Sequence, residues 1–190
     1  MTDEAVSIRR ANADSATAAA LADVLLDCVE AGASIGFMLP LSRARAVAFW
    51  EGVLAAAVLG ERIVLVAEDA ALGGIVGTVQ LIFATPENQP HRADVAKMQV
   101  HRRARRRGIG AALLRAIEQE ALRAGKTLLV LDTVTGSDAD RLYSILGWQR
   151  CGEIPNYALW PGGGLCSTTL FYRDLAPPPA PPEVPPIPPK

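Results

Sequence analysis

Hydrophobic positions repeat every three or four residues in four stretches of the chain, which is the period of an amphipathic helix. Asp14 or Ser15 precedes the first stretch and Ser42 the second, and such side chains cap helices. Gly125 follows the third stretch, where glycine favours the left-handed end of a helix. We expect helices over residues 15–31, 43–59, 109–123 and 138–147.

Other stretches alternate between apolar and polar residues, or are wholly apolar over a few positions, and these patterns indicate β-strands. We expect strands over residues 6–11, 62–68, 75–84, 93–100, 127–131, 148–153 and 167–173. Residues 154–166 are rich in Gly and Pro and are expected to form an irregular insert. The order βααββ, βα, βα, ββ predicts an α/β domain, with a mixed and mostly antiparallel sheet of about seven strands and flanking helices.

Composition sets the domain boundaries. Residues 176–190 contain nine prolines among fifteen residues, so we expect a disordered or polyproline tail there. Residues 1–175 suit one domain. No apolar run approaches the ~20 residues of a membrane span, and the first residues do not resemble a secretory signal.

Charge and cysteine content exclude several classes of protein. The three cysteines have no CxxC spacing, which argues against both a disulfide framework and a metal site and favours a reducing cytoplasm. A net charge of −1 argues against general binding of nucleic acid or of an anionic membrane. The charge is uneven, however, because five arginines fall between Arg102 and Arg107.

These arginines lead into Gly108-Ile109-Gly110-Ala111, between a predicted strand and a predicted helix. The first turn of a helix has free N–H groups and a partial positive charge, and glycines let a ligand approach the backbone. The segment therefore predicts a cradle for a diphosphate. It lacks the Gly-Lys-Ser/Thr ending of a Walker loop and the glycine spacing of a dinucleotide site. The alternative is a solvated surface run of arginines.

Two motifs resemble a known family. Arg105-x-x-Gly108-x-Gly110-Ala111 is similar to the acetyl-coenzyme-A motif of the GNAT (GCN5-related) N-acetyltransferases, and Ala139-x-x-Leu142-Tyr143-x-x-x-Gly147-Trp148 to a second motif of that family. The resemblance implies acetyl-CoA as cosubstrate. Where the family often has a cofactor-binding Asn, this chain has Gly136 with Ser137 beside it. The cofactor-binding residues it implies are Met98, Val100, Arg105, Arg106, Arg107, Gly108, Ile109, Gly110, Ala111 and Ser137.

A narrower resemblance concerns the loop that starts Gly32-Ala-Ser-Ile-Gly-Phe-Met, together with Leu131-Asp132-Thr133 and the segment from Gly152 to Tyr157. These segments look like the tabtoxin-resistance acetyltransferases, which acetylate a β-lactam-containing amino-acid toxin. That resemblance implies a small primary amine as acceptor, and a role in resistance to a toxin or antibiotic.

Acetyl transfer to an amine needs a base, donors for the oxyanion and a proton for the departing thiolate. By resemblance, Tyr143 is the general acid, and backbone N–H groups between Met98 and Val100 bind the oxyanion. Tyr143 could instead be a core residue of its helix. Asp132, after an apolar strand, and Asp94, on the neighbouring strand, are our candidates for the base. Asp132 could instead cap the segment that follows it.

The sequence leaves several functions open. The first is a cytoplasmic N-acetyltransferase, monomeric or homodimeric, that transfers acetyl from acetyl-CoA directly to a small-molecule amine without nucleic-acid or membrane partners. The second is an acetyltransferase acting on a protein N-terminus or lysine. The third is a non-catalytic acyl-CoA-binding protein, and the fourth is an RNA-binding protein, which the lack of an aromatic platform argues against.

Overall fold

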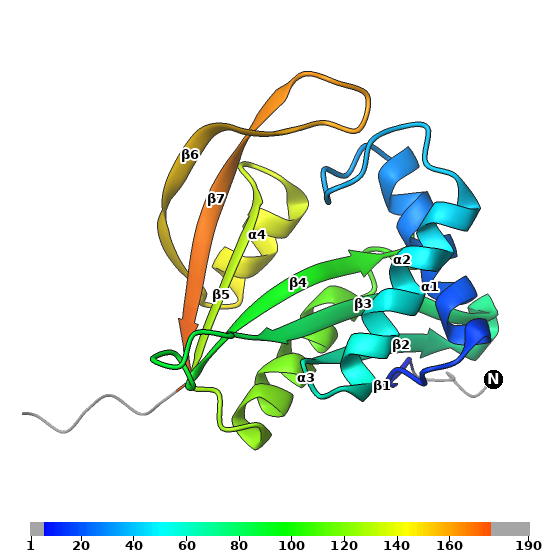
Figure 1. The fold of residues 1–190 in the computed structure, drawn as a ribbon. Coiled ribbons are helices and arrows are strands. Elements are labelled where there is room, and N and C mark those ends of the chain that lie inside the picture. The colour runs from blue at the N-terminus through cyan, green and yellow to red at the C-terminus, as the bar shows by residue number, and fades with distance from the viewer. Residues whose placement is uncertain (1–5, 176–190) are drawn as a thin grey trace, which may run out of the picture.

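Seven strands form one sheet in the computed structural model, which describes residues 6–175 (Figure 1). The strands lie in the order β1-β2-β3-β4-β5-β7-β6, and every neighbouring pair is antiparallel except β4–β5. Their bounds are β1 Ser7–Arg10, β2 Arg62–Asp69, β3 Gly74–Phe83, β4 Arg92–Val100, β5 Leu128–Val134, β6 Gln149–Leu159 and β7 Leu165–Asp174. This confirms the predicted α/β fold with a mixed seven-stranded sheet. The predicted tail, 176–190, lies outside the described residues.

Helices cover both faces of this sheet. Their bounds are α1 Ser15–Glu30, α2 Arg43–Val58, α3 Ile109–Arg123 and α4 Asp138–Ile145. α1 and α2 pack on one face against residues such as Val64 and Val66, with Trp50 fully buried between them. α3 packs on the other face against the alternate residues, such as Leu65 and Leu81, and Tyr143 of α4 belongs to the same core. No helix in residues 6–175 is long and apolar enough to cross a membrane.

β4 and β5 pair over a short distance and then diverge (Figure 1). Their ladder holds Arg92 to Leu128, Ala93 to Leu129 and Asp94 to Val130. Beyond Asp94, β4 continues to pair with β3 up to Val100, whereas β5 pairs with β7. The edge of β4 that faces β5 is therefore open from Val95 to Val100, and its backbone groups can pair with a ligand.

The structure corrects two predicted segments. Residues 154–166 are not an irregular insert, because β6 runs to Leu159 and β7 starts at Leu165, so the glycines lie at a hairpin tip. β6 is the last strand of the sheet, where Pro155 is tolerated, and the ladder shifts between Ile154 and Ala158. β5 also extends beyond Leu131 to Val134, because Asp132 and Thr133 pair with β7 despite being polar.

Candidate active site

The turn before α3 has the geometry of an anion site. Gly108 is the N-cap of α3 with φ of +76°, and no side chain caps the helix, so the first N–H groups have no partner from a capping side chain. Ile109 packs into the core, so only its backbone is available there. Arg106 is exposed and also has a positive φ, of 63°. An anionic group of a ligand would find free donors and a cationic side chain at this turn.

Gly110 has a different role from Gly108. A Cβ atom on Gly110 would lie 3.0 Å from Leu142 Cδ2 and 3.7 Å from Met98 Sδ, whereas nothing lies within 4 Å of a Cβ on Gly108. Gly110 therefore lets α3, α4 and β4 approach one another, and Gly108 supplies the left-handed backbone. Ala111 follows Gly110 in the first turn of α3.

Most arginines of the turn hold the turn itself. Arg107 donates to the fully buried Asp69 at 2.5 Å, and Arg105 Nε donates to the carbonyl oxygen of Val100 at 3.0 Å. The backbone N–H and Nε of Arg102 both donate to Asp27 on α1 at 2.8 Å. The exposed side chain of Arg106 makes no hydrogen bond or ion pair within residues 6–175, so it can contact a ligand without losing a structural contact.

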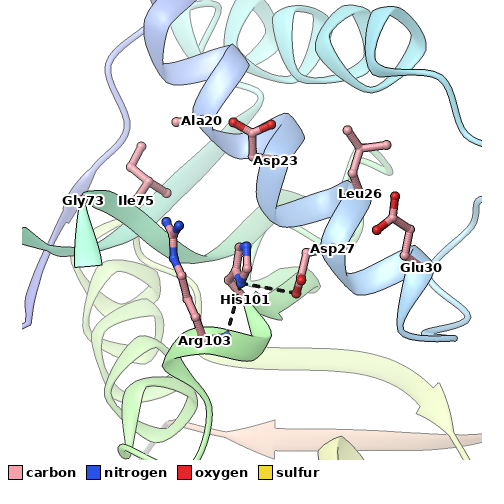
Figure 2. Close-up of a pocket in the computed structure, with 9 residues that line it drawn as sticks. All are labelled: Ala20, Asp23, Leu26, Asp27, Glu30, Gly73, Ile75, His101 and Arg103. Carbon is pink, nitrogen blue, oxygen red and sulfur yellow. Dashed lines mark hydrogen bonds and ion pairs between the residues drawn. The ribbon is translucent and has the colours of Figure 1, made fainter.

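A cavity of about 450 Å³ lies beside this turn, and Figure 2 shows Asp27, Glu30, His101 and Arg103 on its walls. Its deepest carboxylate, Asp27, already accepts from Arg102. Burial favours a raised pKa for Asp27, but the hydrogen bonds from Arg102 and the charge of His101 lower the pKa below its ordinary value. At this cavity α1 therefore stabilises the segment before α3 through the bonds between Asp27 and Arg102. The residues predicted to take part in acetyl transfer do not line the cavity.

Tyr143 is a buried residue of α4. Tyr143 is 5% exposed and packs against Trp148 and Phe171, with ring centroids 5.7 and 5.8 Å away. Burial raises the pKa of its hydroxyl, and the charge of Asp132 raises the pKa further. The hydroxyl therefore keeps its proton at neutral pH. Tyr143 is therefore a core residue of its helix, as the alternative interpretation had it, and its role as general acid stays a prediction.

The two candidate carboxylates lie on the same face of the sheet, opposite to buried Val95 and Leu131. Asp132 is exposed, and its Oδ2 accepts a hydrogen bond of 2.9 Å from the buried Thr168 of β7. Asp94 lies in the last pair before β4 and β5 diverge, and Arg92 donates to it at 2.8 Å. The carboxylate of Asp132 is thus held by Thr168 and remains accessible to a ligand, whereas Asp94 already has a cationic partner in Arg92.

Ser137 has a structural role at the start of α4. It is the N-cap of α4, and its hydroxyl accepts from the backbone N–H of Asp140 at 3.2 Å. The carboxylate of Asp140 in turn accepts from the N–H of Gly136 at 2.6 Å. The turn that begins α4 is fixed by these two bonds.

A loop and a hairpin meet across the diverging strands. Ser34 Oγ donates to the carbonyl oxygen of Leu159 at 2.7 Å. The N–H of Leu39 donates to the carbonyl oxygen of Pro161 at 2.9 Å. The loop between α1 and α2 is therefore connected to the β6–β7 hairpin, as Figure 1 also shows.

Residues 60–150 match the profile of the acetyltransferase (GNAT) domain. The match starts at β2 and ends in β6, so it contains the turn before α3, Asp94, Asp132 and Tyr143.

A curated relative also matches part of the chain. The chain is 35% identical over 115 residues to an uncharacterized N-acetyltransferase encoded in the hisH-hisA intergenic region of Azospirillum brasilense. The matched part is 59% of this chain and 65% of the relative, so the chain spans about two thirds of that protein's length.

Solved structures share the fold of this chain over most of its length. yncA of Salmonella typhimurium, solved with its cofactor acetyl-CoA, superposes with a TM-score of 0.74 at 24% identity, over 95% of this chain and 99% of its own. A GCN5-related N-acetyltransferase from Kribbella flavida superposes with a TM-score of 0.71 at 24% identity, over 92% of this chain and 100% of its own. A ribosomal-protein-alanine N-acetyltransferase from Brucella melitensis superposes with a TM-score of 0.73 at 23% identity, over 89% of this chain and 99% of its own. At these identities the likeness concerns the fold.

The candidate site contains a further polar residue, which the sequence pattern did not indicate. Lys97 of β4 is half-buried, and its Nζ donates to the carbonyl oxygen of Ile35 at 2.9 Å. Burial lowers the pKa of its ammonium, and the charge of Asp132 opposes this shift. A lysine inside an alternating strand pattern carries no signal of its own, so only the fold brings it near Asp132.

Proposed function

We propose that the protein is an N-acetyltransferase that transfers acetyl from acetyl-CoA directly to the primary amine of a small molecule. One observation carries this proposal: the open edge of β4 follows Asp94 and leads to the turn before α3, whose first N–H groups have no side-chain cap. Asp132 and Tyr143 lie on the elements that follow, β5 and α4. The GNAT domain match over residues 60–150 supports the reaction type.

The residues present fit acetyl-CoA. The free N–H groups at residues 109–111 and the side chain of Arg106 would hold its diphosphate. The unpaired edge of β4 between Val95 and Val100 would pair with the amides of its pantetheine arm. When bound, the cosubstrate supplies a thioester whose acetyl carbon accepts the amine. Arg105 and Arg107 support the turn in this proposal, since their side chains hold Val100 and Asp69.

Asp132 would prepare the acceptor. An ammonium ion has no lone pair, so the amine must lose a proton before it attacks. The exposed carboxylate of Asp132 attracts the ammonium, and it can take that proton directly or through water. Thr168 fixes the carboxylate through its hydroxyl, which reduces the rotamers available to Asp132. Asp94 plays a smaller part, because Arg92 neutralises it.

Tyr143 would assist the departing thiolate. As the new C–N bond forms, the C–S bond breaks and the sulfur acquires negative charge, and backbone N–H groups of Met98–Val100 would stabilise the carbonyl oxygen meanwhile. The raised pKa keeps the phenol protonated, so it is a hydrogen-bond donor at any pH where the amine is reactive. After the attack the nitrogen loses a second proton, and one proton ends on the sulfur. The ammonium form of the amine and acetyl-CoA thus give the amide, the thiol of coenzyme A and one proton, which Asp132 releases to water.

The link between the α1–α2 loop and the β6–β7 hairpin favours a small acceptor over a protein terminus. Ser34 and Leu39 connect the two segments over the diverging strands, which restricts access for a folded partner. The resemblance to tabtoxin-resistance acetyltransferases supports the same choice, and a role in resistance belongs to this proposal. A cytoplasmic location, a monomeric or dimeric state and the absence of nucleic-acid partners remain predictions.

Two measurements test this function. Calorimetry with coenzyme A should give saturable binding, and a thiol-release assay with acetyl-CoA should show saturable turnover with one class of small amines. Turnover with peptides alone would favour the protein acetyltransferase instead. Binding of coenzyme A without turnover of any small amine or peptide would favour a non-catalytic acyl-CoA-binding protein.

A further inference from the structure

Lys97 occupies an unusual place in the sheet. The register between β3 and β4 shifts at this point: Thr78 pairs with Gln99 and Gln80 with Ala96, so Lys97 and Met98 together oppose Val79. This is a β-bulge, and Lys97 adopts a left-handed φ of 50° that residues other than glycine seldom take. Bulges of this kind redirect a side chain, and strained backbone of this kind gathers at functional sites.

The bulge sends neighbouring side chains to opposite faces of the sheet. Met98 points toward α3, where its sulfur would lie 3.7 Å from a Cβ on Gly110. Lys97 points toward the α1–α2 side, where its Nζ lies 5.9 Å from the ring centroid of Phe49 and bonds to Ile35. Lys97 therefore lies under the loop that joins the β6–β7 hairpin, on the same side of the sheet as Asp132.

The ammonium of Lys97 lacks a counter-ion in residues 6–175. Its one hydrogen bond there is to a neutral carbonyl, and no carboxylate of the described chain lies within 4.0 Å of it. Asp132 acts on it at longer range only. A half-buried ammonium without a counter-ion has unused N–H donors and has lost part of its hydration without an ion pair to replace it. A carboxylate of a ligand would supply that ion pair and compensate for the lost hydration.

A buried amide strengthens the case for a polar ligand on this side. Gln99, two residues after Lys97, is 3% exposed, and neither its Oε1 nor its Nε2 has a hydrogen-bond partner. Its pairing with Thr78 places it on the α1–α2 face, as Lys97 is. Buried polar atoms are nearly always satisfied by protein, water or ligand.

We propose that Lys97 selects the acceptor by pairing with a carboxylate that the acceptor carries beside its amine, while Asp132 pairs with the amine in its ammonium form. The acceptor class is then an α-amino acid or a close analogue with the same two charges. Lys97 and Asp132 carry opposite charges and form no ion pair within 4.0 Å, so each can pair with the complementary end of such a zwitterion. This inference rests on the proposed acetyl transfer.

The test compares acceptors that differ only at the carboxylate. Thiol release is measured with a panel of common L-amino acids, the α-amide of each and the corresponding decarboxylated amine. The wild-type protein should give a kcat/KM about 30-fold or more higher for its preferred acid than for the matching amide, because the amide removes one desolvated charge pair. A preference for amides or decarboxylated amines would overturn the inference.

Variants of Lys97 separate recognition from catalysis. Lys97→Met should lower kcat/KM for the acid about 30-fold and for the amide less than about threefold, mainly through KM, and Lys97→Arg should retain part of the preference. Lys126→Met is the matched control, since Lys126 donates to Pro90 at the other end of the sheet. An equal loss for acid and amide would mean that Lys97 acts as a base or as a structural residue.

The outcomes also separate this inference from the proposed function. Turnover of amines without any dependence on the carboxylate would leave the acetyltransferase proposal intact and overturn the role of Lys97. Binding of coenzyme A without turnover of any member of the panel would overturn both. Circular dichroism shows whether Lys97→Met folds. If it does not, the wild-type ratio of kcat/KM for the acid to kcat/KM for the amide tests the inferred recognition of the carboxylate.

Discussion

The two sides of β4 offer different kinds of chemical group to a ligand: mainly backbone groups on one side and side chains on the other. Toward α3, the turn at residues 105–111 offers backbone N–H groups, and glycines set its shape. Toward α1 and α2, Lys97, Asp132 and Thr168 offer side chains from three different strands. A backbone site suits an invariant group such as a diphosphate, whereas side chains can change with the acceptor. Cofactor binding and acceptor choice should therefore respond to different substitutions.

The largest effect should come from Tyr143→Phe, which keeps the packing against Trp148 and Phe171 but removes the hydroxyl. We expect kcat to fall about 100-fold or more while the Kd for acetyl-CoA stays within about threefold. Steady-state kinetics and calorimetry check this. Tyr172→Phe, at a partly exposed tyrosine of β7, is the matched control. Unchanged turnover would remove the hydroxyl from the mechanism.

Asp132→Asn should have the next largest effect and should distinguish the two carboxylates. We expect kcat/KM to fall about 30-fold, because the amide neither takes a proton nor attracts an ammonium. Asp94→Asn should cost about threefold or less, since Arg92 already pairs with Asp94. Both values come from the thiol-release assay under subsaturating acceptor. The reverse ranking would make Asp94 the base.

Arg106→Glu should affect the cofactor side alone. Reversing an exposed charge at the turn should weaken coenzyme A binding about tenfold at low ionic strength, and less at high salt. Calorimetry at two salt concentrations measures this effect. Arg115→Glu, on an exposed position further along α3, should leave binding unchanged. If both variants bind equally well, the diphosphate does not lie at this turn.

Asp27 links the stability of the turn to pH. Its folded pKa lies below its unfolded pKa, so its bonds to Arg102 stabilise the protein above the unfolded pKa, and this contribution is lost as the pH falls through the folded value. Asp27→Asn should lower the Tm by about 3 °C at pH 7 and flatten its decline in acid. Thermal melts from neutral to acidic pH check this. A parallel decline in both proteins would contradict it.

Ser34→Ala should have the smallest effect. It removes the bond from the α1–α2 loop to Leu159, but the bond from Leu39 to Pro161 remains. We expect the acceptor KM to rise about two- to threefold with kcat and cofactor affinity unchanged. A change in coenzyme A affinity instead would mean that the two sides of β4 are coupled.

The same contrast explains what the sequence could predict. The turn before α3 was predictable because its glycines and arginines are adjacent in the chain. The partners of those arginines were not, since Asp69 lies 38 residues before Arg107. The role of Lys97 depends on a register shift between β3 and β4, which a strand pattern does not reveal. The β6–β7 hairpin was missed because an edge strand accepts Pro155 and a bulge.

Transfer of isotope-labelled acetyl tests the central claim most directly. The wild-type protein is incubated with acetyl-CoA labelled in its acetyl group and with the amine that gave the fastest thiol release, and product and protein are both analysed by mass spectrometry. The account predicts label on the nitrogen of the amine, in proportion to the thiol released, and none on the protein. Label retained on the protein, for example at the exposed Cys151, or thiol released without labelled amine, would contradict direct transfer.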